Sequence, residues 1–217
     1  MSALDVRMFT VGPVHENCFI VRQKDAPSAL IVDPGDEADK LLEAVTRLGI
    51  ETVEAILITH THFDHIGAVA PVAAATKAPV YCPELETQVL ANIMDYVPWP
   101  GFGPFESYEA DHTVAGGDTL QLAGLDIDVI FTPGHSPGHV TYAIPDHEAL
   151  FSGDVLFQGS VGRVDLPGGD WPTLLASIEN LVSSYPAETT VYPGHMGITT
   201  LGRERATNPF LRELAER

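Results

Sequence analysis

Short apolar runs rich in branched and aromatic residues recur along the chain, and each ends at glycine, proline or a polar residue. Runs of this length and composition predict β-strands. They lie at 6–11, 17–21, 29–32, 53–58 and 79–82 in the first half of the chain, and at 119–122, 125–131, 140–144, 148–152 and 190–192 in the second half.

Apolar residues at a spacing of three and four predict helices in the segments between these strands. One helix begins at a cap on Asp36 and ends at Gly49, and two more cover 66–77 and 84–94. A fourth begins at a cap on Asp170. Strands that alternate with helices in this way are typical of an α/β fold.

The length and composition are those of one large globular domain. The chain has 217 residues, of which 45% are hydrophobic, and it contains no internal repeat and no linker-like stretch. We therefore expect a single domain over 1–217.

The charge balance limits the kinds of partner. With 30 acidic and 11 basic residues the formal net charge is −19, and Lys and Arg cluster nowhere, so we expect no nucleic-acid partner. No apolar run approaches the roughly 20 residues that a transmembrane helix needs, and the first residues lack the regions of a signal peptide. We expect a cytoplasmic protein that does not bind membranes, in which Cys18 and Cys82 are buried thiols.

Four residues that can bind a metal ion follow the strand 53–58 directly: His60, His62, Asp64 and His65. Positions i and i+2 of an extended backbone point the same way, so His60 and His62 can bind one ion together. Asp64 and His65 can face a second ion as the chain turns. A polar loop that uses histidine only for capping would rarely hold so many ligand types in so short a segment, so we favour a metal site.

Three later strands end in residues of the same types. His135 stands in a Pro-Gly turn that can aim it toward the first group, whereas His139 is expected to stabilise that turn from behind. Asp154 also stands at a strand end, where a carboxylate can place one oxygen on each of two ions. His195 follows the last predicted strand.

Three other features have two interpretations each. Asp33, at a strand end, either orients a metal-bound histidine or shapes a turn. Arg163 either binds a substrate carboxylate or pairs with Asp165, and we favour the pair. The segment 96–105 holds four aromatic residues among three prolines and two glycines, and it either covers a substrate pocket or packs against another subunit. Both a monomer and a homodimer are therefore compatible with the sequence.

The strand-end histidines and aspartates, in this order, resemble the metallo-β-lactamase superfamily over nearly the whole chain. This resemblance implies a four-layer αββα sandwich with the metal site at one edge, between the two sheets. It also implies two divalent metal ions, which we expect to be zinc, with iron or manganese as alternatives. By position in the family pattern, the first ion would be held by His60, His62 and His135, the second by Asp64, His65 and His195, and both by Asp154 as a bridge.

Within the superfamily, the segments 32–35, 132–139 and 162–165 most resemble the hydroxyacylglutathione hydrolase (type II glyoxalase) group, and 202–210 is similar to its short bacterial branch. The resemblance implies hydrolysis of a thioester, such as an S-2-hydroxyacyl-thiol, by a hydroxide that bridges two metal ions. Asp64 would be catalytic as well, holding the proton of that nucleophile. The basic helical region with which full-length members hold glutathione has no counterpart here, so the thiol carrier stays open.

The chemistry of the residues agrees with such a reaction. Two divalent ions that share a water lower its pKa toward neutrality, and a thiolate leaves without strong acid assistance. The expected partner is thus a small-molecule thioester.

Two alternatives share these residues. Similar sequences include persulfide dioxygenases, in which a single iron would be held here by His60, His135 and Asp154. A lactonase would use the same metal site as the thioesterase. A noncatalytic binding module is disfavoured because no expected ligand is missing. Metal content and oxygen dependence distinguish the dioxygenase from the hydrolases.

Overall fold

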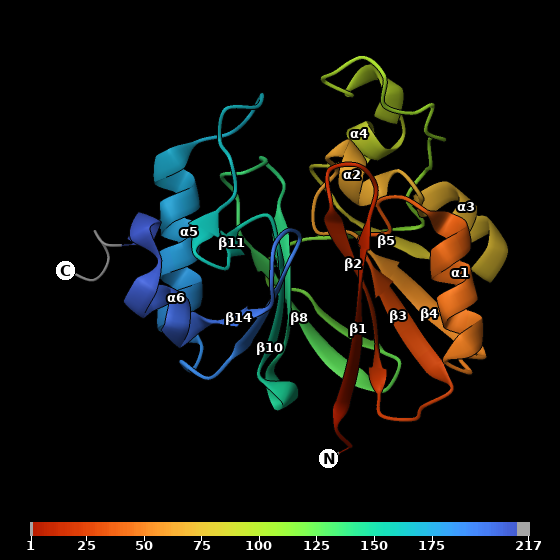
Figure 1. Ribbon diagram of the computed structural model, residues 1–217, viewed down its shortest axis with the longest axis horizontal. Coiled ribbons are helices and arrows are strands. Elements are labelled where there is room, and N and C mark those ends of the chain that lie inside the picture. The colour runs from red at the N-terminus through yellow and green to blue at the C-terminus, as the bar shows by residue number, and fades with distance from the viewer. Residues whose placement is uncertain (1, 212–217) are drawn as a thin grey trace.

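Two β-sheets lie face to face in the middle of the molecule, with helices on both outer sides (Figure 1). The computed structural model describes residues 2–211, and residues 1 and 212–217 of the predicted domain lie outside the described part. Each of the two large sheets has six strands.

The first sheet follows the order of the chain. Its first three strands are antiparallel neighbours, and the other three join in parallel. They are β1 (Leu4–Val11), β2 (Glu16–Gln23), β3 (Ser28–Val32), β4 (Thr52–Leu57), β5 (Val80–Pro83) and β6 (His112–Val114).

The second sheet has the order β14-β13-β10-β9-β8-β7, in which only β10 and β13 pair in parallel. A separate two-stranded ribbon joins β11 to β12. The strands are β7 (Thr119–Leu122), β8 (Leu125–Phe131), β9 (Val140–Ile144), β10 (Ala149–Gly153), β11 (Leu156–Phe157), β12 (Ser160–Val161), β13 (Thr190–Pro193) and β14 (Thr199–Thr200).

Helices cover the outer face of each sheet (Figure 1). Those beside the first sheet are α1 (Ala38–Arg47), α2 (Phe63–Ile66), α3 (Val69–Thr76) and α4 (Thr87–Leu90), and those beside the second are α5 (Trp171–Ser184) and α6 (Leu201–Thr207). Three 3-10 turns are η1 (Ile93–Asp95), η2 (Pro145–His147) and η3 (Pro209–Leu211).

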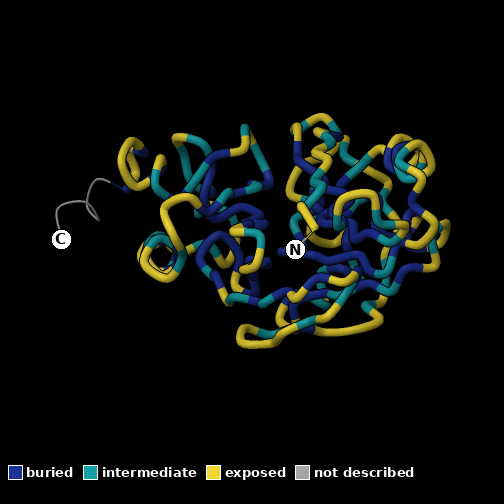
Figure 2. Tube along the Cα trace, turned by 90° about the horizontal axis from the view of Figure 1, so that it is seen from below, coloured by how far each residue is buried: buried dark blue, intermediate teal, exposed yellow. Residues whose placement is uncertain are grey.

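The period of two along each strand divides the apolar residues between separate cores. In β2, Cys18 and Ile20 pack toward the helices of the first sheet, whereas Phe19 and Val21 pack toward the second sheet. A third core joins the second sheet to α5 and α6. Figure 2 shows buried segments through the middle and exposed segments outside. The four-layer αββα sandwich implied by the resemblance is therefore confirmed.

The strand predictions agree with the structure to within two residues at each end, except that four short strands, β6, β11, β12 and β14, were missed. Asp36 is not the helix cap. The cap position is Glu37, in the left-handed region with φ of 51°, and Asp36 instead accepts a hydrogen bond from the Glu37 amide.

Two predicted helices are shorter than expected. The segment 66–77 is interrupted at Ala68, whose amide donates to the Pro34 carbonyl at 3.0 Å and so joins the helix to the β3 loop. The segment 84–94 forms only α4 and η1, because the backbone leaves the helical region at Asn92, where φ is −141°. None of the helices in residues 2–211 is long and apolar enough to cross a membrane.

Candidate metal centre

All seven predicted metal ligands come together at one edge of the sandwich, where strands of both sheets end. The group from His60 to His65 follows β4 of the first sheet. His135, Asp154 and His195 follow β8, β10 and β13 of the second. The ligand types that the sequence places at four separate strand ends thus meet between the two sheets.

Three imidazoles form the first cluster. The Nε2 atom of His135 lies 3.2 Å from Nε2 of His60 and 2.8 Å from Nδ1 of His62. His60 and His135 are buried and His62 is half-buried, with its ring beside the cavity described below. These atoms are close enough together to contact one ion.

Asp64, His65 and His195 form the second cluster. Oδ2 of Asp64 lies 3.3 Å from Nε2 of His195 and 3.9 Å from Nε2 of His65. His65 is fully buried, whereas 21% of the His195 side chain is exposed. This cluster therefore differs from the first in holding a carboxylate and in lying partly open to solvent.

Asp154 lies between the two clusters. Its Oδ2 atom is 3.4 Å from Nε2 of His135 in the first cluster and 3.5 Å from Nε2 of His195 in the second. Its Oδ1 atom is 3.3 Å from Nε2 of His65. The position is the one that a bridging carboxylate requires.

Hydrogen bonds at the outer nitrogens determine which ring atoms face inward. Nδ1 of His135 lies 2.7 Å from the Arg163 carbonyl, which can only accept, so the proton is on Nδ1 and the Nε2 lone pair faces the cluster. Nδ1 of His65 donates in the same way to Oδ2 of Asp33 at 3.0 Å. Such outer partners orient metal-binding imidazoles.

Thr59 extends this arrangement to His60. The Thr59 hydroxyl donates to Oδ2 of Asp33 at 2.6 Å. The Thr59 hydroxyl oxygen is therefore free to accept from Nδ1 of His60 at 3.1 Å. Asp33 also accepts from the Thr59 amide at 2.7 Å. The interpretation in which Asp33 orients a histidine of the metal site is therefore supported, and the Asp33 backbone lies in the left-handed region, with φ of 48°.

The chemistry of these residues fits cations. Nε2 of His65 and Oδ1 of Asp154 are buried without a hydrogen-bond partner, which buried polar atoms seldom are. In the first cluster, lone pairs of neutral imidazoles converge and repel one another unless a cation lies between them. Zinc, iron and manganese all accept imidazole and carboxylate ligands, so the donor set fits two such ions.

The electrostatic environment keeps the first cluster neutral. Burial is the largest cause that lowers the pKa values of His60 and His135, and the neighbouring histidines lower that of His60 further. Burial and the adjacent His135 lower the pKa of His62 to about 4. These rings are therefore unprotonated at neutral pH and available to an ion.

In the second cluster the histidine pKa values are shifted in the opposite direction. Burial would lower the pKa of His65 and of His195, but the Asp154 carboxylate and its neighbours outweigh it, and both pKa values are raised. Burial would raise the pKa of Asp64, yet its hydrogen bond with His195 and the nearby His65 keep that pKa below its usual value. In the second cluster an ion therefore has to replace protons on histidine.

His139 supports the site without joining either cluster, as predicted. Its Nε2 atom accepts a hydrogen bond from the Asp154 amide at 3.0 Å, and Nδ1 lies 3.0 Å from the Thr132 hydroxyl. The ring also stacks on His60, with centroids 4.8 Å apart. His139 thus holds the backbone of Asp154 in place.

Glu86 is a supporting residue that the sequence does not reveal. Its buried carboxylate accepts hydrogen bonds from the amide and hydroxyl of Thr61, from the Ser136 hydroxyl at 2.7 Å and from the Gly138 amide at 2.8 Å. It therefore joins the loop of His60 and His62 to the loop of His135. In the sequence it is one glutamate in an acidic segment, and no local signal distinguishes it.

Glu16 is a second residue without a sequence signal. Its carboxyl group is fully buried, neither oxygen has a hydrogen-bond partner, and Oε1 lies 3.8 Å from Nδ1 of His65. Burial raises the pKa of Glu16 well above its usual value. The side chain therefore lies behind the second cluster as a group that favours its neutral form.

Two glycines make the close approach of these loops feasible. Gly134 has φ of 127° and packs against the first turn of α5, where a Cβ atom would overlap the Leu174 backbone. At Gly194, a Cβ atom would overlap both Asp154 and His65. A side chain at either position would displace the strand-end turn that carries a neighbouring histidine.

A cavity of about 390 Å³ opens beside the clusters, and His62, Asp64, Asp154 and His195 face it. The segment 96–105 contributes part of its wall. The interpretation in which this segment covers a pocket is thus supported by the structure, and its role between subunits stays a prediction.

The predicted pair of Arg163 and Asp165 is confirmed. Nε and Nη2 of the guanidinium donate to the two carboxylate oxygens at 2.6 and 2.7 Å. The guanidinium also lies 5.5 Å from the ring centre of Trp99. The hydrogen bond from Arg163 holds the pKa of Asp165 at about 2.

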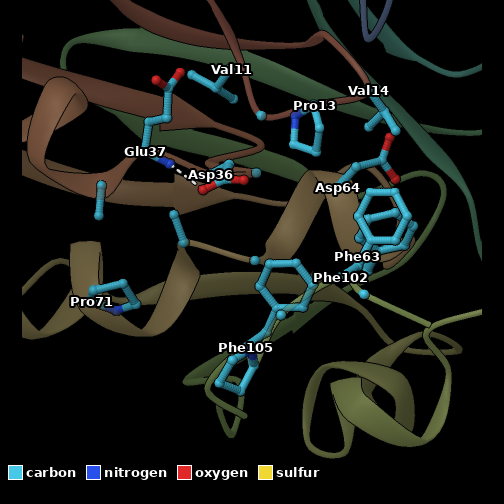
Figure 3. Close-up of a pocket in the computed structure, with 18 residues that line it drawn as sticks. Val11, Pro13, Val14, Asp36, Glu37, Phe63, Asp64, Pro71, Phe102 and Phe105 are labelled. Carbon is cyan, nitrogen blue, oxygen red and sulfur yellow. Dashed lines mark hydrogen bonds between the residues drawn. The ribbon is translucent and has the colours of Figure 1, made fainter. Parts of the chain in front are cut away.

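A second cavity, of about 380 Å³, is lined by Phe63 and Asp64 among others (Figure 3). It shares Val14, Phe63 and Asp64 with the first cavity. Figure 3 shows Asp36 and Glu37 at one side of it. Asp64 is therefore the one candidate ligand among the described residues that lines both cavities.

Comparisons with known proteins agree with this geometry. Residues 11–195 match the model of the metallo-beta-lactamase superfamily. The chain is 30% identical over 210 residues to the hydroxyacylglutathione hydrolase GloC of Haemophilus influenzae, covering 96% of this chain and 98% of the relative.

Two crystal structures are similar along their whole length. The B3 metallo-beta-lactamase BLEG-1 is 40% identical, with a TM-score of 0.89 and coverage of 95% of this chain and 99% of the other. TTHA1623 in a di-iron-bound form is 42% identical, with a TM-score of 0.84 and coverage of 94% and 100%.

Proposed function

We propose that this chain, which belongs to the metallo-beta-lactamase superfamily, hydrolyses thioesters such as S-2-hydroxyacyl-thiols. Membership and the two ligand clusters identify it as a metal-dependent hydrolase. The thioester is the finer step and is our proposal. We also propose that the substrate is a small molecule, and that neither nucleic acids nor membranes are partners.

The observation that carries the proposal is the position of Asp154 between two complete clusters. His60, His62 and His135 would hold one ion, and Asp64, His65 and His195 the other. When bound, two divalent ions activate a water between them and polarise the carbonyl that is attacked. We expect zinc, with iron and manganese as alternatives, and the similar TTHA1623 carries two irons.

Asp64 is the candidate for handling the proton of the attacking water. Its carboxylate lines the cavity, and its hydrogen bond with His195 keeps it ionised. A carboxylate at this position accepts a hydrogen bond from the water and orients it toward the substrate carbonyl. We therefore assign Asp64 a catalytic role in addition to ligand binding.

The residues around the cavity favour a leaving group that needs no acid. Glu86 is occupied by four hydrogen bonds, and Arg163 is paired with Asp165. A thiolate leaves unprotonated more readily than an alkoxide or an amine does, so a thioester suits this site. The relative GloC, by its name, acts on such a compound.

Three other reactions are alternatives to thioester hydrolysis at this site. A persulfide dioxygenase would need only His60, His135 and Asp154, and the complete second cluster argues for two ions instead. A lactonase would use the same ligands. Hydrolysis of a β-lactam is favoured by the 40% identity to BLEG-1, although the amine it releases would benefit from an acid.

The test is metal content followed by hydrolysis. Protein purified without chelators is analysed for ions per chain and then offered a panel of S-lactoyl thioesters with and without oxygen. We expect about two ions and thioester cleavage that is independent of oxygen. A single iron, with oxygen uptake on a persulfide and no thioester cleavage, would establish the dioxygenase in its place. A lactone and a β-lactam complete the panel.

A further inference from the structure

The wall of the cavity beside the clusters is apolar on two sides. One side comes from α4 and the segments before and after it, and includes Leu85, Val89 and Trp99. The other includes Pro137 and Leu166. Leu85 is 62% exposed and Trp99 is 40% exposed, so apolar surface faces the space where a substrate would lie.

No Lys and no Arg other than Arg163 stands among the described residues that line this cavity, and the charge of Arg163 is already balanced. Both Asp165 oxygens accept from the guanidinium, and the Trp99 ring lies beside it. A substrate carboxylate would have to displace Asp165 from a two-point pair to gain a comparable partner.

The second cavity offers no cation either. None of the described residues that line it is Lys or Arg. Its lining does include three acidic residues, Asp36, Glu37 and Asp64 (Figure 3). The nearby Lys40 ammonium is bonded to Glu37 and to the Thr10 carbonyl. An anionic group that extended from the clusters in this direction would meet carboxylates.

Glutathione does not match these surroundings. It carries two carboxylates and one ammonium group, and the carboxylates lie several bonds from the sulfur. In a thioester held at the clusters, they would therefore reach the apolar walls or the acidic second cavity. A carboxylate that leaves water for an apolar wall without a partner loses hydration that nothing replaces.

We infer that the site hydrolyses acyl thioesters whose thiol portion is uncharged, and that the walls formed by Leu85, Val89 and Trp99 exclude anionic carriers such as glutathione. This inference rests on the proposed thioesterase function and names its substrate class. The clusters would contact the thioester group, and the apolar walls the carrier.

The first experiment compares two substrates that differ by one charge. S-lactoyl-3-mercaptopropionate is anionic, and its methyl ester is neutral and nearly the same size. With the metal-loaded protein, kcat/KM for the ester should exceed that for the carboxylate by roughly tenfold or more, after each is divided by its rate of base hydrolysis. S-lactoylglutathione should behave like the carboxylate.

A variant tests the walls directly. Leu85→Lys adds a cation to the lining at an exposed position, so the fold should tolerate it. It should lower the preference for the ester about fivefold by improving turnover of the carboxylate. Gln121→Lys is the matched control, because it adds the same charge at an exposed site on β7 outside the lining, and it should leave the preference unchanged.

A binding measurement gives a second readout. The unreactive thioethers that correspond to the two substrates are titrated into the protein by calorimetry, and the neutral one should bind more tightly, with the difference reduced in Leu85→Lys. Equal or better turnover of S-lactoylglutathione and the carboxylate would overturn the inference while the thioesterase proposal stands. Failure of the loaded protein to cleave any thioester would instead overturn the proposed function.

Discussion

The two ligand clusters stand side by side, yet they differ in charge and in support. The first consists of three imidazoles whose pKa values are lowered, so it is neutral and needs no proton to leave before an ion binds. The second holds a carboxylate and two histidines whose pKa values are raised. We conclude that the first cluster is preorganised for a cation and the second exchanges protons for one.

The supports differ as well. The carboxylate of Glu86 holds the loops of the first cluster by accepting from Thr61, Ser136 and Gly138. Behind the second cluster, Asp33 accepts from His65, and Glu16 lies close without a hydrogen bond. Glu86 therefore supports the loops of the first cluster alone, whereas Asp33 also orients His60 of the first cluster through the Thr59 hydroxyl.

The largest effect is expected from Asp154→Asn, which removes the charge between the clusters. An amide serves poorly as a bridge between two cations, so kcat/KM on an S-lactoyl thioester should fall by about 10³-fold or more. Steady-state kinetics and metal analysis measure it. Asp146→Asn, an exposed change in η2, is the control, and activity of Asp154→Asn within tenfold of the parent would contradict the bridging role.

Removing one ligand from each cluster separates the clusters. His195→Ala should leave one ion bound at the first cluster and reduce kcat/KM by about 100-fold. His62→Ala should weaken the first ion instead. Ions per chain after dialysis against a weak chelator distinguish the two variants, and the loss of both ions in His195→Ala would show that the clusters do not bind independently.

Glu86→Gln tests whether the two clusters are supported separately, without changing a candidate metal ligand. The amide cannot accept all four hydrogen bonds of the carboxylate, so affinity for the first ion should fall by roughly tenfold to a hundredfold. Asp33→Asn should weaken both ions, because Asp33 accepts from His65 directly and orients His60 through the Thr59 hydroxyl. Glu84→Gln, an exposed neighbour, is the control. Metal titrations that show Glu86→Gln affecting the second ion more would refute the assignment.

A change of pH tests the same difference between the clusters without any substitution. The raised pKa values of His65 and His195 mean that these rings take up protons first as pH falls, whereas His62, with a pKa of about 4, keeps its lone pair. Between about pH 6.5, the ordinary value for histidine, and pH 4, the second ion should be released before the first. Affinity should fall about tenfold per pH unit for each competing proton. Release of both ions together across this range would contradict the difference.

Much of the fold and of the candidate site could be predicted because both are marked locally. Alternation in β8 and the branched runs of β3 and β4 specify strands wherever they lie in the fold. Histidine and aspartate at the strand ends are conspicuous residue types, and the resemblance supplied their grouping. The prediction of one helix over 84–94 was wrong, because contacts distant in sequence rather than local helix propensity decide where α4 ends.

By itself the sequence determined the strands, the candidate ligand residues at their ends and the acidic net charge, because periodicity, residue chemistry and net charge are properties of the chain alone. Tertiary structure alone decided that Glu86 and Glu16 stand behind the clusters and that apolar walls line the cavity. Those relations join residues from both halves of the chain, and only the packing of the two sheets brings them within a few ångströms.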